Sequence, residues 1–198
     1  MDRYQQILLL ANELGILRPR DLDPIGIPRA YLQRLTERGD LERVERGLYR
    51  LPDALITQYQ SLLEVAKRVP ASVICLLSAL AYHDLTTQLP YRVWVALPTG
   101  SRTPQLAYLP LRIVRISGAA FAAGVEGKII GNVPMKIYNP AKTIADCFKF
   151  RNKVGLDVAI EALRECLAER RASPDELLKY ANICRVSKVM RPYLEALV

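Results

Sequence analysis

Residues 28–51 read PRAYLQRLTERGDLERVERGLYRL, which predicts a helix followed by a short β-hairpin. Pro28 suits the first turn of the helix and Gly39 its C-terminal cap, because proline is tolerated where helices begin and glycine where they end. Two strand-like segments, residues 41–44 and 47–51, follow the helix and form the two arms of the hairpin. A helix that leads directly into a hairpin is typical of the second half of a winged helix-turn-helix.

The residues before this stretch complete the same arrangement. Residues 2–14 carry apolar side chains at helical spacing, and Gly15 ends the run. Pro19 suits the first turn of a short second helix, and Gly26 marks the turn that precedes the third helix. We therefore expect residues 1–52 to form a winged helix-turn-helix domain.

The remaining residues, 53–198, predict a mixed α/β domain that ends in several helices. An amphipathic helix over residues 54–69 could link the two domains. Residues 72–84 favour a buried helix, with a strand as the weaker alternative. The predicted strands cover residues 91–97, 111–116, 126–130 and 133–138, the last two around a Gly131-Asn132 turn, and the predicted helices cover residues 141–150, 154–170, 173–183 and 188–197. The expected fold class of the chain is therefore α+β.

The chain is basic, with a formal net charge of +8 at neutral pH. A basic chain favours a polyanionic partner such as DNA. Residues 1–52 contribute little to the excess, since they hold nine basic side chains against eight acidic ones. Residues 53–150 hold ten basic side chains against five acidic ones. A DNA-binding hypothesis must therefore account for the basic middle of the chain.

The composition argues against several other classes of protein. Four widely spaced cysteines and a single histidine, His83, do not form a zinc-ligand pattern, so we expect no metal, no disulfide and no cofactor. A histidine-based catalytic set would have to use His83. The sequence has no uninterrupted apolar run of about 18 residues, as a membrane span needs. Its beginning lacks the pattern of a signal peptide, so we expect a cytoplasmic protein without a membrane partner.

The third predicted helix, residues 28–38, presents the candidate base-reading residues. Leu32 and Leu35 point into the domain, so Arg29 and Gln33 lie on or beside the exposed face. Arginine can read guanine and glutamine can read adenine in the major groove. Arg34 is a candidate phosphate contact, and Arg18 could reach the backbone from the second helix. The alternative interpretation is an ordinary solvated helix face.

The predicted hairpin supplies the candidate wing. Its arginines could reach a groove or the DNA backbone, with Arg46 at the tip and Arg43 and Arg50 on the strands. Glu42 and Glu45 alternate with these arginines, so a solvated hairpin remains the alternative.

The basic middle of the chain suggests a second DNA-binding surface. The candidates are Arg102, Arg112, Arg115 and Lys128. Arg112 and Arg115 are an odd number of residues apart, so a regular strand would direct them to opposite faces. Scattered surface charge is the alternative explanation.

One segment loosely resembles a metal-dependent nuclease. Glu126-Gly127-Lys128 enters an apolar strand, and Asp84 lies upstream as a further carboxylate. This three-residue pattern is common, however, and it is simply explained as a polar turn. We therefore expect no enzymatic activity and assign no catalytic residue.

Four stretches, taken in order, resemble the AbiEi family of antitoxins from bacterial type IV toxin–antitoxin and abortive-infection systems. They are GILRPRDL (15–22), LTERGDLERVERGLYR (35–50), SALAYHDLT (78–86) and NPAKTIADCFK (139–149). The resemblance spans nearly the whole chain, and its specificity lies in the order of the stretches.

The resemblance implies a winged-helix repressor domain joined to a mixed α/β antitoxin domain. It implies autoregulation, in which the protein binds inverted repeats of double-stranded DNA in its own promoter. It also implies a nucleotidyltransferase-type toxin that is counteracted without a stable complex, and a contribution of basic second-domain residues to DNA binding. Two alternatives stay open: a metal-dependent nuclease with a winged-helix targeting domain, and a winged-helix module that binds protein.

Overall fold

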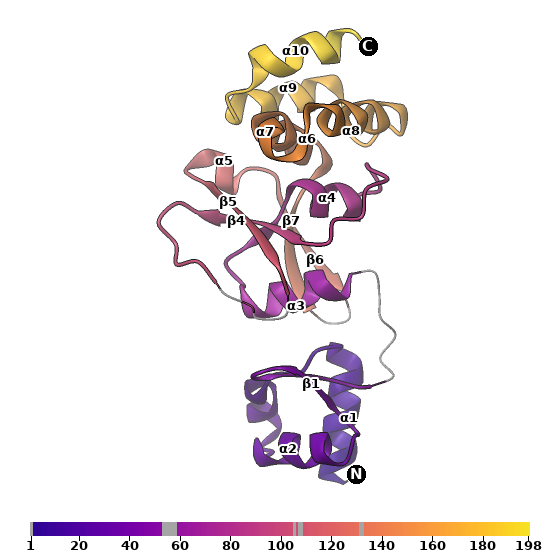
Figure 1. Ribbon diagram of the computed structural model, residues 1–198, viewed down its shortest axis with the longest axis vertical. Helices are drawn as coiled ribbons and strands as arrows, with labels where there is room; N and C mark the ends of the chain where they lie inside the picture. Colours follow the sequence, from indigo (N-terminus) through magenta and orange to yellow (C-terminus); the bar gives the residue numbers. More distant parts are fainter. Residues whose placement is uncertain (1, 53–58, 105, 107–108, 131–132) are drawn as a thin grey trace. The chain divides into compact units, whose positions relative to one another are not determined.

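The computed structural model describes the chain except for residues 1, 53–58, 105, 107–108 and 131–132 (Figure 1). The chain divides into two compact units. The N-terminal unit comprises Met1–Arg68 together with Ile129–Pro134, and the second unit comprises Val69–Lys128 and Met135–Val198. The predicted domain boundary after Pro52 adjoins residues outside the described part, so it stays a prediction. Of the predicted linker helix, the described part holds α3 (Gln60–Arg68).

The N-terminal unit has the order of elements expected of a winged helix-turn-helix. The elements are α1 (Arg3–Leu14), a 3-10 helix η1 (Pro19–Ile25), α2 (Ala30–Glu37), β1 (Glu42–Glu45) and β2 (Leu48–Arg50). Pro19 opens η1, and Gly26 ends it in the left-handed conformation that glycine tolerates. The predicted order of elements is therefore confirmed.

The hairpin differs from the prediction by one residue at its turn. Arg43 pairs with Tyr49, and a bulge separates this pair from the pair of Glu45 with Leu48. The turn therefore falls at Arg46-Gly47, where Gly47 has a φ of 77°, rather than at Glu45-Arg46. Glycine adopts a positive φ without a steric penalty, which explains the shift.

Leu17 anchors the hairpin to the helical part of the domain. The Leu17 amide donates to the Tyr49 carbonyl at 2.8 Å, and the Tyr49 amide donates back to the Leu17 carbonyl at 2.9 Å. Leu32 and Leu35 of α2 are buried in the same core as Leu17. The core thus orients α2 so that its opposite face is exposed.

A five-stranded mixed sheet forms the framework of the second unit, although residues 129–130 of β6 and 133–134 of β7 are grouped with the N-terminal unit. Its strands, in spatial order, are β5 (Leu111–Ile116), β4 (Val93–Pro98), β3 (Val73–Ile74), β7 (Val133–Tyr138) and β6 (Val125–Ile130). β3 runs antiparallel to β4 and parallel to β7, and β4 runs parallel to β5. β5 and β6 are therefore the two edges of the sheet.

The buried helix predicted over residues 72–84 is only partly correct. Residues 73 and 74 form β3, the central strand, and α4 (Leu76–Tyr82) begins only after Cys75. A short apolar run does not reveal by its spacing whether it is a buried strand or a buried helix. Long-range pairing with β4 and β7 decided the outcome for Val73 and Ile74.

Four helices after the sheet agree closely with the prediction: α6 (Pro140–Lys149), α8 (Leu156–Ala168), α9 (Pro174–Ile183) and α10 (Ser187–Glu195). Two short helices were not predicted: α5 (Ala119–Ala122), between β5 and β6, and α7 (Arg151–Val154). Gly155, with a φ of 98°, separates α7 from α8, so α8 begins two residues after the predicted start at Val154. Figure 1 shows α6 to α10 gathered on one side of the sheet, with α6 in contact with α4, α8 and α9. The expected α+β fold class is confirmed.

A buried ion pair lies at the centre of the second unit. The Lys142 ammonium contacts the Asp146 carboxylate one turn further along α6, and both side chains are fully buried. The Cys184 thiol donates to Asp146 at 3.3 Å, and the Lys142 Nζ lies 3.9 Å from the centre of the Tyr138 ring. Burial raises the pKa of Asp146, and Lys142 opposes that shift.

Gly124 closes the space beside Lys142. A Cβ atom added to Gly124 would lie 2.6 Å from the Lys142 Cβ, and the backbone there has a φ of 71°. Both observations restrict the position to glycine. The buried pair therefore sits in a space with no room for another side chain.

His83 also has a structural position. It caps the C-terminal end of α4, and its Nε2 lies 2.7 Å from the Tyr138 carbonyl. Because a carbonyl only accepts, this imidazole nitrogen carries the proton. Burial lowers the pKa of His83. This position fits the capping and packing role more simply than an acid–base pair with Asp84.

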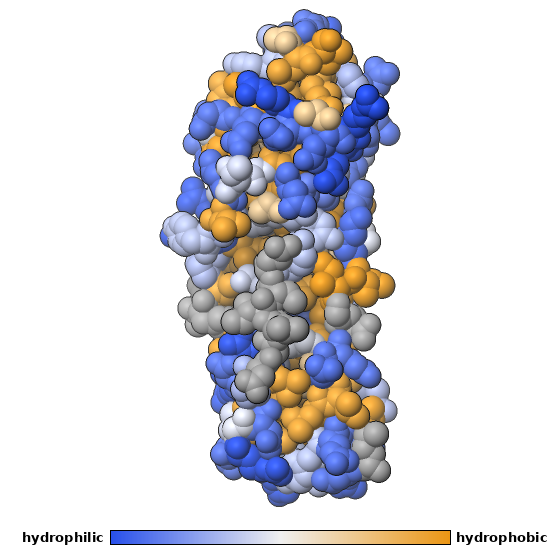
Figure 2. Space-filling model, turned by 90° about the vertical axis from the view of Figure 1, so that its right-hand side faces the viewer, coloured by the Kyte–Doolittle hydropathy of each residue, from blue (hydrophilic) through white to orange (hydrophobic). Residues whose placement is uncertain are grey.

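The surface is mixed in character. On the face shown in Figure 2, hydrophilic side chains interrupt the apolar areas of both units. No helix in the described ranges has both the length and the apolar character needed to cross a membrane.

Candidate nucleic-acid interface

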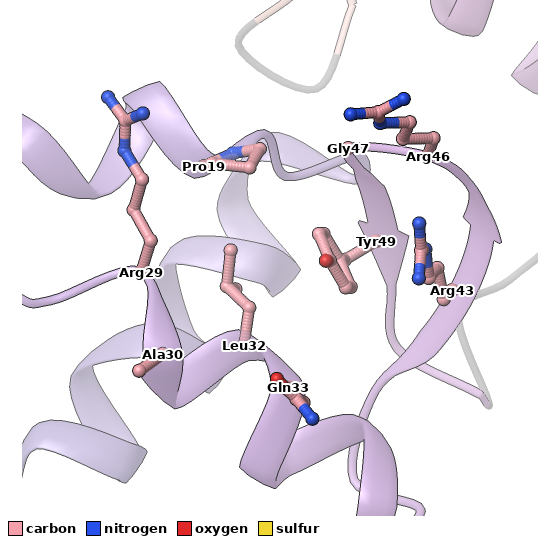
Figure 3. A pocket seen from close by; sticks show the side chains of 9 residues that line it. All are labelled: Pro19, Arg29, Ala30, Leu32, Gln33, Arg43, Arg46, Gly47 and Tyr49. Atoms are coloured by element: carbon pink, nitrogen blue, oxygen red, sulfur yellow. The ribbon is translucent and has the colours of Figure 1, made fainter.

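A groove lies between α2 and the hairpin of the N-terminal unit, with a volume of about 570 Å³. Arg29 lies on one side of it, and Arg43 and Arg46 extend from the hairpin on the other (Figure 3). Ala30 and Gln33 of α2 also line the groove, and the Tyr49 ring lies between the two sides. The structure therefore brings together four of the predicted DNA-binding residues, Arg29, Gln33, Arg43 and Arg46.

Arg29 is held at the start of α2 by an acidic residue that the sequence analysis did not single out. Its Nη2 lies 2.8 Å from one Asp23 carboxylate oxygen, and its Nε and Nη2 lie 3.3 and 3.2 Å from the other. These hydrogen bonds raise the pKa of the guanidinium. Asp23 thus fixes one edge of the Arg29 guanidinium and leaves Nη1 directed elsewhere. The six-residue separation across the Gly26 turn hid this pair from analysis of the sequence.

Gln33 is oriented by its own helix. Its Nε2 donates to Glu37 at 2.9 Å, one turn further along α2. An amide has two N–H donors and a carbonyl acceptor, so this bond uses only part of its capacity. Gln33 therefore keeps a donor and an acceptor for another partner.

The hairpin arginines fall into two groups. Arg43 and Arg46 are exposed, and the described part of the structure places neither in an ion pair. Arg50 is different, because its Nε lies 2.8 Å from the Glu42 carboxylate across the hairpin. The Arg50 charge is therefore largely satisfied within the wing.

Arg18 and Arg34 also differ in their surroundings. The Arg18 guanidinium lies 3.2 Å from the Asp21 carboxylate, and the Arg18 backbone amide donates to the same carboxylate at 2.8 Å. These two contacts between Arg18 and Asp21 stabilise the start of η1. Arg34 is exposed on α2 and stacks over the Tyr31 ring, 5.4 Å from its centre. Arg34 thus stays free for a phosphate, whereas Arg18 is held by Asp21.

The candidate second surface is divided between the two edges of the sheet. Arg112 and Arg115 lie on the β5 edge and Lys128 on the β6 edge. Regular pairing of β5 with β4 directs Arg112 and Arg115 to opposite faces, as expected from their spacing. Arg115 also donates to Thr103 at 2.8 Å and to the Pro98 carbonyl at 3.3 Å. These side chains therefore do not form one patch.

The nuclease-like segment has a simple local explanation. Lys128 Nζ lies 2.8 Å from the Glu126 carboxylate, and this hydrogen bond raises the pKa of Lys128. Within the described residues, no three His, Cys, Asp or Glu side chains gather as metal ligands would. Glu126 and Lys128 neutralise each other in place of forming a carboxylate cluster.

Comparisons with known proteins extend this description. No curated protein sequence matches the chain. In fold, the chain is similar to the crystal structure of the RV2827C protein from Mycobacterium tuberculosis, with a TM-score of 0.58 and 17% sequence identity. The similarity covers 92% of this chain and 75% of that one, and it shows a shared fold.

The groove falls within a segment that a family model matches. Residues 5–52 match the model described as "Transcriptional regulator, AbiEi antitoxin". This range contains η1, α2, both hairpin strands and all of α1 except Arg3 and Tyr4. Residues 5–52 thus match the AbiEi antitoxin family of transcriptional regulators, which confirms for this segment the resemblance inferred from the sequence.

Proposed function

We propose that this protein is a DNA-binding transcriptional autorepressor that recognises inverted repeats in its own promoter. The observation that carries the proposal is the groove between α2 and the hairpin, where Arg29, Arg43 and Arg46 surround Gln33. This groove lies in the segment that matches a family of transcriptional regulators. In the proposed binding mode α2 enters the major groove, as recognition helices do.

The two sides of the groove suit different tasks, base reading by α2 and phosphate binding by the wing. Arg29 and Gln33 are placed at the exposed N-terminal half of α2, from which side chains reach base edges. Ala30 between them is small enough for a base pair to approach. Arg43 and Arg46 of the wing then neutralise backbone phosphates, which supply most of the affinity.

The nearly balanced charge of the N-terminal region is compatible with this model because its charges are unevenly paired. Asp21 pairs with Arg18, Glu42 with Arg50, and Asp40 with Arg38. These three pairs involve no residue that lines the groove, and Arg43 and Arg46 are in no ion pair among the described residues. At the groove itself, Asp23 pairs with Arg29. Of the four second-unit candidates for DNA binding, Arg102 and Arg112 are the two whose side chains are exposed.

We expect Arg46→Ala to weaken binding to all duplexes alike. The slope of log K against log salt concentration is negative, and a lost phosphate contact should make it less steep by about 1. The measurement is fluorescence anisotropy over a salt series, with a duplex from upstream of the protein's own reading frame and a shuffled duplex. Arg164→Ala, which removes an exposed arginine of α8, is the matched control and should leave the slope unchanged.

Two results would argue against this proposal. Equal slopes for Arg46→Ala and wild type would remove the wing from the interface. A wild-type protein that binds neither duplex would favour the alternative in which this domain binds protein.

We also propose that the protein counteracts a nucleotidyltransferase-type toxin without forming a stable complex with it. The family description of residues 5–52 as an antitoxin supports this proposal. Co-expression with a nucleotidyltransferase encoded beside it should restore growth, and size-exclusion chromatography of the mixture should give two separate peaks. A stable joint peak would contradict the proposed mode, and an absence of growth rescue would contradict the antitoxin role.

A further inference from the structure

Five side chains form a continuous cluster between α1 and α2, which we call the arginine–tyrosine ladder: Arg3, Tyr4, Tyr31, Arg34 and Arg38. The centres of the Tyr4 and Tyr31 rings are 5.1 Å apart, and the two rings are tilted by 58°. The guanidinium carbons of Arg3 and Arg34 lie 5.9 and 5.4 Å from the centre of the Tyr31 ring. That of Arg38 lies 4.9 Å from the centre of the Tyr4 ring. Arginines therefore stack on both rings of a tyrosine pair at the protein surface.

The ladder and the groove occupy opposite flanks of α2. Tyr31, Arg34 and Arg38 are three and four residues apart, so at 3.6 residues per turn they form one stripe along the helix. Arg29 and Gln33 are four residues apart and form another stripe, which lines the groove. The exposed face of α2 therefore has the wing on one side and the ladder on the other.

Two cations of the ladder are not neutralised within the domain. Arg38 pairs with Asp40 at 2.9 Å, but in the described ranges neither Arg3 nor Arg34 belongs to an ion pair. Both side chains are exposed. Arg3 also donates from Nη1 to the Tyr31 hydroxyl at 3.4 Å, and this bond raises the pKa of its guanidinium. The rings thus hold two cations in place without removing their charge.

Stacking on a ring leaves the guanidinium well suited to bind an oxyanion. A guanidinium has five N–H donors, and Arg3 uses one of its Nη1 donors on the Tyr31 hydroxyl. Its other donors, like those of Arg34, belong to no ion pair among the described residues. The stacked side chain has also lost much of its rotational freedom before any partner binds. A pair of arginines held in this way is a preorganised site for phosphate oxygens.

We propose that the arginine–tyrosine ladder is a second phosphate clamp, with Arg3 and Arg34 binding the DNA backbone on the side of the major groove opposite the wing. The major groove is about 12 Å wide, so a helix inside it has one sugar–phosphate backbone on each flank. Arg43 and Arg46 reach one backbone, and Arg3 and Arg34 reach the other. This inference rests on the proposed DNA-binding function and adds the second half of the clamp.

The test is the double variant Arg3→Ala/Arg34→Ala of the full chain, measured by anisotropy over a salt series. Loss of two phosphate contacts should make the negative slope of log K against log salt less steep by about 2, equally for the promoter and shuffled duplexes. Arg164→Ala/Arg191→Ala, two exposed arginines of α8 and α10, is the matched control and should keep the wild-type slope. Arg3→Lys/Arg34→Lys keeps both positive charges and should retain most of the wild-type slope.

A purely structural ladder would give a different result. The alanine double variant would then melt at a lower temperature by circular dichroism yet bind with the wild-type slope, and this outcome overturns the inference. If Arg46→Ala lowers the slope and the ladder variant does not, the ladder is wrong and the proposed function stands. If wild-type protein binds no duplex, both fall together.

Discussion

Lys142→Met will lower the free energy of unfolding by about 3–5 kcal/mol, the usual effect of removing one partner from a buried ion pair. The substitution leaves Asp146 without its cation in a fully buried place, with only the Cys184 thiol as a described hydrogen-bond donor. Urea unfolding followed by fluorescence will measure the change, because the single tryptophan, Trp94, lies in the same core.

The control for this prediction removes both charges. Lys142→Met/Asp146→Leu should be clearly more stable than Lys142→Met alone, because no isolated carboxylate then remains. Lys188→Met, which removes an exposed lysine of α10, should change the stability by less than about 0.5 kcal/mol. If the double variant were as unstable as the single one, the loss would come from packing and not from the unpaired charge.

Arg29→Ala should weaken binding to the promoter duplex by roughly 5- to 150-fold, which corresponds to the loss of about 1–3 kcal/mol expected when a base-reading arginine is removed. It should also relax the preference at one base pair, because Arg29 lies where recognition helices read base edges. Anisotropy measured with a set of duplexes, each changed at one base pair, gives both quantities. Arg29→Lys keeps the charge and should still lose the base preference.

Asp23→Ala tests how Arg29 is positioned, because two physical effects predict opposite results. Removing a carboxylate from a DNA-facing surface should by itself strengthen binding to every duplex. Loss of the Asp23 hydrogen bonds should free the Arg29 guanidinium and reduce discrimination at its base pair. We expect discrimination to fall even if overall affinity rises. Unchanged discrimination would show that Asp23 has no part in orienting Arg29.

The fold could be predicted from the sequence wherever local signals determine it. Residues 111–116 and 133–138 form strands with the predicted bounds, and Pro19 and Gly26 mark the beginning and end of η1 as expected. Val73-Ile74 was the main error, because a two-residue strand is defined by its neighbours β4 and β7 and not by its own spacing.

The candidate site shows the same limit. The spacing of Arg29 and Gln33 within α2 placed them together correctly, because one helix determines both positions. The partners that orient or occupy these arginines, Asp23 for Arg29 and Glu42 for Arg50, come from neighbouring elements. The hydrogen bond from Arg3 to the Tyr31 hydroxyl joins residues 28 positions apart. Such pairings depend on the tertiary fold, so composition and periodicity carried no sign of them.

The two hydrogen bonds between Leu17 and Tyr49 fix the position of the hairpin within the N-terminal unit. The span between the wing tip and α2 is set before any duplex arrives, since the hairpin cannot slide without breaking both bonds. Under the DNA binding proposed above, a duplex that contacts both the wing and α2 must adjust its own groove width and bend to fit. Base steps that deform easily would then be favoured even where no side chain touches them.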